Sequence, residues 1–176
     1  ESAGLAVWNG PPATSFDNVY EQIEELGTIT GHVADAAALV ETMRSGIDNT
    51  VAATPRPPQP LTYYHELDDA FRSATENTFI GQVYALFGMQ SVADFQEVDS
   101  DYPQLAEDEI ISANPDFIFL ADGGESAATV AARPGWGHMQ AVMNGNVVVL
   151  DPDIASRWGP RLVDFVAAVS AALLSV

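Results

Sequence analysis

The stretch EDEIISANPDFIFLA, from Glu107 to Ala121, decides the fold class. Its opening, EDEIISA, predicts a short helix, and the run DFIFLA that follows predicts a strand. This strand is apolar along most of its length and lacks the regular alternation of apolar and polar residues that marks a half-exposed strand. Such runs are typical of strands that are buried on both faces in a mainly parallel sheet.

The same alternation of strand and helix continues upstream of this stretch. LTYYHEL predicts a strand, and NTFIGQVYALFG predicts a helix. Asn77 or Thr78 would cap the start of that helix, and Gly88 would end it.

Downstream, a short helix is expected near residues 127–132, followed by the strand NVVVLD. A closing helix is expected over 160–174, with Pro160 in its first turn, where a missing N–H costs little. We therefore expect an α/β fold, a Rossmann-like lobe in which flanking helices cover a mainly parallel sheet of four or more strands.

The first 30 residues predict a strand and a helix ahead of this lobe. GLAVW is a short apolar run that ends in a turn, as a strand would. Thr14 and Asp17 fit a capping box for the helix that follows, and Gly27 and Gly31 are expected to end it.

A longer amphipathic helix is expected over 31–52, beside the sheet lobe and unbroken at its middle. The segment TPRPPQP, from Thr54 to Pro60, cannot be helical because each proline lacks a donor and restrains the residue before it. It predicts a stiff linker, so the lobe proper begins at Leu61.

Composition excludes several classes of function. The chain has 25 acidic and six basic residues, a formal net charge of −19, and neither lysine nor cysteine. The electrostatic field of this net negative charge disfavours nucleic acid and anionic membranes as partners. Such a charge is typical of a solubilising acidic surface. Without lysine or cysteine there is no Walker A loop, Schiff base or thiolate chemistry. No apolar run reaches about 18 residues, so we expect no membrane insertion in this segment.

Ligands of parallel α/β sheets bind at the carboxyl ends of the strands, in the loops that lead to helices. One such loop contains RWGPR, which has two of the six arginines of the chain. Arg157 is expected at the ligand rim, and Arg161 is expected to pair with a carboxylate. In RPGW, Arg133 would close a short helix and Trp136 would fill the core.

The motifs, taken in order, resemble the C-terminal lobe of ABC-importer binding proteins for ferric siderophores, haem and vitamin B12. The matching stretches are YYHELDD, NTFIGQVYALFG, YPQLAEDEIISANPDFIFLADG, RPGWGHMQAVMNGNVVVLD and SRWGPRLVDF. The resemblance implies that residues 1–13 are a remnant of an N-terminal lobe, that 14–60 form the helical backbone and linker between lobes, and that 61–176 form the C-terminal ligand-binding lobe. It also implies a periplasmic or extracellular protein, membrane-anchored at full length, that delivers its ligand to a permease.

The resemblance also implies the ligand contacts. Tyr102, Asp153 and Arg157 match the leading contact positions, and the wider candidate set adds Glu66, Asn77 and Phe79. No intrinsic cofactor is expected, and the ligand would be an iron chelate, haem or corrinoid. The histidine and carboxylate pattern of the manganese and zinc branch of these proteins is absent, so no protein metal site is expected.

Each contact has a plainer explanation as well. Tyr102 would serve equally as an aromatic lid on the core, and Asp153 as a turn residue. His65 and Glu66 are neighbours on a strand, so their side chains leave on opposite faces. A packing role for the His65 imidazole is then favoured over metal binding.

The resemblance also implies a second functional surface. In these binding proteins, an acidic residue on each lobe docks into a basic pocket of the permease. Asp108 occupies the matching position, and Glu107 or Glu109 could substitute for it. The alternative is an acidic first helical turn, which the helix dipole favours in any protein.

Two other hypotheses stay open on the sequence. One is an enzyme of chelatase-like or nitrogenase-like fold that uses the carboxylates Asp151, Asp153 and Glu66. The other is a structural fragment without activity of its own. An enzyme would require carboxylates with strongly perturbed pKa values or a bound ion.

Overall fold

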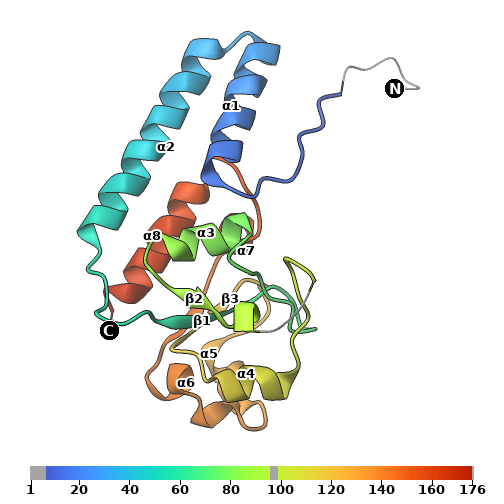
Figure 1. Ribbon diagram of the computed structural model, residues 1–176, viewed down its shortest axis with the longest axis vertical. Coiled ribbons are helices and arrows are strands. Elements are labelled where there is room, and N and C mark those ends of the chain that lie inside the picture. Colours follow the sequence, from blue (N-terminus) through green and yellow to red (C-terminus); the bar gives the residue numbers. More distant parts are fainter. Residues whose placement is uncertain (1–6, 96–98, 176) are drawn as a thin grey trace.

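A computed structural model describes residues 7–95 and 99–175. A helical hairpin, α1 (Phe16–Thr30) and α2 (Val33–Ala53), packs against one side of a sheet lobe that contains the described strands (Figure 1). In the described part of the chain, no helix combines the length and the apolar character needed to cross a membrane.

The sheet has four strands in the order β2-β1-β3-β4, and every neighbouring pair is parallel. The strands are β1 (Thr62–Glu66), β2 (Gln90–Ser91), β3 (Phe117–Leu120) and β4 (Val147–Val149). The predicted α/β lobe with a parallel sheet is therefore confirmed. The two-residue strand β2 was not expected, because it is too short to produce a sequence pattern.

Helices cover both faces of the sheet, which explains the apolar strands. One face packs on α3 (Phe79–Ala85) and α8 (Leu162–Leu173), with the hairpin packed on α8 beyond them. The other face packs on α4 (Glu107–Ala113), α5 (Ala127–Ala132) and α6 (Gln140–Met143) (Figure 1). In β3, Phe117 and Phe119 enter the first core, whereas Ile118 and Leu120 enter the second. Every position of β3 is thus buried, and no polar position of this strand is left to mark a solvent face.

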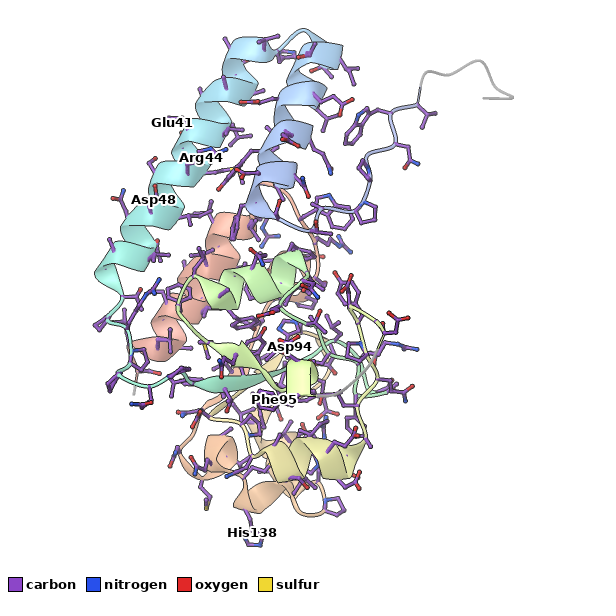
Figure 2. The ribbon with its side chains drawn as sticks, in the orientation of Figure 1. Glu41, Arg44, Asp48, Asp94, Phe95 and His138 are labelled. Carbon is purple, nitrogen blue, oxygen red and sulfur yellow. The ribbon has the colours of Figure 1, made fainter. Side chains whose placement is uncertain are left out.

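The helix α2 runs unbroken for 21 residues, as predicted, which is about 30 Å at 1.5 Å per residue. Arg44 lies on its face turned toward α1, where it stacks over Tyr20 and pairs with Asp17 at 3.1 Å (Figure 2). Gly31 ends α1 in a left-handed conformation, with φ at 78°. Gly27 does not end the helix, because it lies inside α1 where Ala36 of α2 approaches closely.

Several predicted helix ends are corrected. The cap of α1 is Ser15, whose hydroxyl accepts the Asn18 N–H, while the Thr14 hydroxyl binds the Asn18 side chain instead. Thr78, and not Asn77, caps α3 by accepting the Gly81 N–H at 3.0 Å.

Three further differences concern the chain ends and the loops. The helix α8 begins at Leu162, so Pro160 lies in the turn before it. The loop after β4 contains a helical turn, α7 (Pro152–Ala155), which no sequence pattern predicts. Most of the predicted strand GLAVW lies outside the described residues, and Val7 and Trp8 are not in a strand.

Candidate ligand site at the carboxyl edge of the sheet

The segment after β4 carries the candidate site. Asp151 caps α7 by accepting the Asp153 N–H at 2.8 Å, and this turn projects Asp153 and Arg157 side by side. Arg157 Nη1 lies 3.1 Å from Asp153 Oδ1, and both side chains are exposed. A shallow pocket of about 260 Å³, which we call the rim pocket, is lined by Asp153, Arg157, Trp158, Gly159, Pro160 and Arg161.

The second arginine of RWGPR is also paired, as the sequence predicts. Arg161 donates to Asp151 at 2.9 Å and approaches Asp164 at 3.5 Å. The Asp153 backbone N–H and the Arg161 guanidinium together hold the pKa of Asp151 below its usual range. Each arginine of the rim pocket therefore has an aspartate in contact, and the pocket is close to neutral.

Trp158 joins the rim pocket to two other elements. Its ring meets Phe79 of α3 edge-on, at a centroid distance of 6.0 Å, and its indole N–H donates to Gln22 of α1 at 3.2 Å. It is 39% exposed. No sequence pattern indicates a role for Trp158, because its partners lie far away in the sequence.

Tyr102, in the loop before α4, does not line the rim pocket. Its side chain is 42% exposed, so it is not a buried lid on the core. Partial burial raises the pKa of its phenol, the charge of Asp101 adds to the rise, and the Thr78 side chain opposes it. Thr78 caps α3 directly before Phe79, whose ring contacts Trp158.

Glu66, Asn77 and Phe79 have different surroundings. Asn77 is exposed in the loop before α3, whereas Phe79 is 3% exposed and packs in the core behind Trp158. Glu66 is completely buried and receives two hydrogen bonds of 2.7 Å from Arg133. In this structure neither Glu66 nor Phe79 offers an exposed surface to a ligand.

The Glu66–Arg133 pair explains the motif RPGW. Arg133 ends α5, as predicted, and its guanidinium stacks 4.5 Å above the buried ring of Trp136. The hydrogen bonds that Arg133 donates to Glu66 raise the pKa of Arg133 above its ordinary value. A buried carboxylate requires such a partner, and only six basic residues are available. An acidic residue in an apolar strand was the signal that could have predicted this pair.

The three carboxylates of the enzyme hypothesis do not form a catalytic group. Asp151, Asp153 and Glu66 are each paired with a different arginine. The pKa of Asp151 is lowered rather than raised, which does not suit a general acid. Within residues 7–95 and 99–175, no set of three or more histidine and carboxylate side chains is arranged to hold a metal ion.

The three acidic residues at the start of α4 differ in their contacts. Glu107 accepts the Trp136 indole N–H at 2.8 Å, and Glu109 accepts the Ala106 backbone N–H at 2.8 Å. Asp108 is exposed, and its side chain has no hydrogen bond or ion pair with any residue that the structure describes. Of the three, Asp108 is the carboxylate available to a partner.

A parallel sheet lobe with a surface pocket at its carboxyl edge and an attached helical hairpin is typical of a class of α/β binding proteins. The family described as "Periplasmic binding protein" matches residues 5–154, and the chain belongs to it. This is a family of binding proteins and not of enzymes, so the resemblance seen in the sequence is confirmed.

Individual relatives agree with this assignment. A cobalamin-binding protein of Halobacterium salinarum is 33% identical over 96% of this chain and 47% of its own length. An uncharacterized ABC transporter substrate-binding lipoprotein, YvrC of Bacillus subtilis, is 29% identical over 93% of this chain and 52% of its own length. The chain thus spans about half the length of the curated relatives it matches.

A solved structure shares the fold. The periplasmic vitamin B12 binding protein BtuF of Vibrio cholerae superposes with a TM-score of 0.78, at 21% identity, over 99% of this chain and 67% of that one.

Proposed function

We propose that this chain supplies the sheet lobe and the interlobe helices of a solute-binding receptor that captures a corrinoid and delivers it to an ABC importer. Under this proposal, residues 61–176 bind the ligand, residues 14–60 connect the two lobes, and residues 1–13 belong to the other lobe. Membership of the family supports the receptor, and the relative named as a cobalamin-binding protein supports the ligand class.

The observation that favours a corrinoid as the ligand is the charge balance of the rim pocket. Arg157 and Arg161 are each in contact with an aspartate, and the whole chain has a formal net charge of −19. Haem carries two carboxylates, and both the long-range field and the neutral pocket disfavour such an anion. A corrinoid presents mainly uncharged amides, which can accept from an arginine and donate to an aspartate at the same time.

The roles of the three leading residues follow from this chemistry. Arg157 would donate charge-assisted hydrogen bonds to amide carbonyls of the ligand. Asp153 would hold the guanidinium in place and accept from amide N–H groups. Tyr102 would offer a partly exposed aromatic face to the macrocycle.

We propose further that the receptor works outside the cytoplasmic membrane, as the lipoprotein relative suggests, and that Asp108 docks on the permease. Asp108 is favoured over Glu107 and Glu109 because those two carboxylates already accept hydrogen bonds within the lobe.

The ligand test is a calorimetric titration of the full-length gene product with cyanocobalamin, haemin and ferrichrome. We expect saturable binding of cyanocobalamin, and we expect Arg157→Ala to weaken it roughly ten- to hundredfold, the value of a hydrogen bond to a charged group. Arg56→Ala is the matched control, because Arg56 lies in the linker beside Leu173, at the other end of α8 from the rim pocket.

Preferred binding of haemin or ferrichrome would overturn the corrinoid proposal. Equal affinity of wild type and Arg157→Ala for cyanocobalamin would overturn the site.

A further inference from the structure

Trp158 lines two adjoining hollows on the surface. One is the rim pocket, where it lies with Asp153 and Arg157. The other is an apolar groove of about 220 Å³ between the RWGPR turn and α1, where it lies with Gln22. The connection from α7 to α8 passes beside the lower part of α1, so one indole faces both the lobe and the hairpin (Figure 1).

The orientation of the Gln22 amide is determined by its two partners. Its Nε2 donates to the Pro11 carbonyl at 2.8 Å, and its Oε1 accepts from Trp158 Nε1 at 3.2 Å. A backbone carbonyl can only accept and an indole N–H can only donate, so the reverse orientation of the amide would lose both bonds. Gln22 is thus a defined acceptor for the indole.

The indole is also held from the side of the lobe. Phe79, which is 3% exposed and embedded in the core, meets the Trp158 ring edge-on. A tryptophan restrained by a hydrogen bond and by a core aromatic, yet 39% exposed, presents a large rigid surface with little conformational entropy left to lose on binding.

We infer that Trp158 is a ligand-contacting residue of the rim pocket and that Gln22 is the positioning residue that sets its ring. Affinity for the ligand then depends on α1 of the hairpin and not on the sheet lobe alone. This inference rests on the proposed corrinoid receptor, because it assigns Trp158 as an aromatic wall against the same ligand.

The test is a set of variants of the full-length gene product titrated with cyanocobalamin. Trp158→Ala should weaken binding by roughly tenfold or more, as the loss of an aromatic wall would. Gln22→Met and Trp158→Phe should each weaken it by about three- to fivefold, because each removes the same hydrogen bond. The double variant Gln22→Met/Trp158→Phe should then lose no more affinity than either single variant, since the two residues act through one hydrogen bond.

Arg56→Ala is the matched control, because Arg56 lies beside Leu173, at the other end of α8 from Trp158. It should keep the wild-type affinity. Unchanged affinity in Gln22→Met would overturn the positioning role of Gln22.

A spectroscopic measurement separates contact with the ligand from a purely structural role. In protein labelled with 5-fluorotryptophan, the ¹⁹F resonance that Trp158→Phe removes should shift on addition of cyanocobalamin. The resonance of the buried Trp136 should stay in place.

The outcomes distinguish the two proposals. If wild type binds cyanocobalamin while Trp158→Ala binds equally well and the Trp158 resonance does not move, this inference is wrong and the proposed function stands. If wild type binds no cyanocobalamin, the proposed function fails and this inference fails with it.

Discussion

His65 shows how burial determines the role of a single titratable residue. It is completely buried, its Nδ1 lies 2.8 Å from the Tyr84 hydroxyl, and its ring packs on Phe165. These contacts confirm the predicted packing role. Burial lowers the pKa of His65 from its ordinary 6.5 to about 3, because the imidazolium would lose its hydration in this core.

A depressed histidine pKa makes stability depend on pH with a defined sign. The unfolded chain binds a proton below about pH 6.5 and the folded chain does not, so this contribution is complete above that pH and is lost as pH falls toward 3. The free energy of unfolding should fall by up to about 1.4 kcal/mol per pH unit in this window. Urea unfolding between pH 7 and pH 4 should show this slope reduced in His65→Phe.

The control for this prediction is His138→Gln, since His138 is exposed at the end of the lobe away from the hairpin (Figure 2). An identical pH slope in wild type and His65→Phe would contradict the assignment of the slope to His65.

At the scale of the elements, the packing of α1 on α2 depends on one glycine. A Cβ on Gly27 would lie 2.4 Å from the Cβ of Ala36, closer than two carbon atoms can approach. The two helices can therefore come together only if one of these positions lacks a side chain. Gly46, in α2, has no such constraint, because a Cβ there would meet Val163 at an ordinary 3.4 Å.

The two glycines should respond in opposite directions to the same substitution. Gly27→Ala should lower the free energy of unfolding by about 1–3 kcal/mol, the range for overpacking. Gly46→Ala should raise it by about 0.5–1 kcal/mol, because alanine favours the helix more than glycine does. Thermal unfolding followed by circular dichroism would measure both, and adding Ala36→Gly to Gly27→Ala should restore part of the loss. A Gly27→Ala protein as stable as Gly46→Ala would contradict the close approach.

At the scale of the whole molecule, the proposed function assigns two surfaces to two partners. The rim pocket lies at the carboxyl edge of the sheet, and Asp108 lies on α4, which covers the sheet face opposite α8 and the hairpin (Figure 1). The high negative charge would accelerate the approach to a basic permease surface, and salt would screen this attraction.

The docking surface can be tested with the cognate permease in nanodiscs. We expect Asp108→Asn to weaken binding about three- to fivefold at low salt, as the loss of an exposed ion pair would, with the difference shrinking as salt is raised. Glu41→Gln is the control, because Glu41 is an exposed carboxylate on α2 of the hairpin (Figure 2). Equal effects of the two substitutions would mean that net charge, and not Asp108, governs docking.

The sequence by itself determined the class of fold and the order of most elements. Apolar runs such as FIFL in β3 indicate strands covered on both faces, and helices such as α5 begin and end where local signals place them. These features depend on interactions within a few residues, so a linear pattern records them. The family resemblance came from the same local motifs in the right order. Period-two geometry also predicted that His65 and Glu66 face opposite sides.

Only the tertiary structure decided which side chains meet. Glu66 and Arg133 pair across 67 residues, and Trp158 and Gln22 across 136. The sequence could require a cation for a buried carboxylate, but six basic residues were available and no pattern selects one of them. The sequence pattern therefore does not predict the partner of Glu66, and it indicates no contact for Trp158. Long-range pairing depends on how the sheet, α5 and the hairpin pack in three dimensions. That packing produces no periodic pattern in the sequence from which it could be predicted.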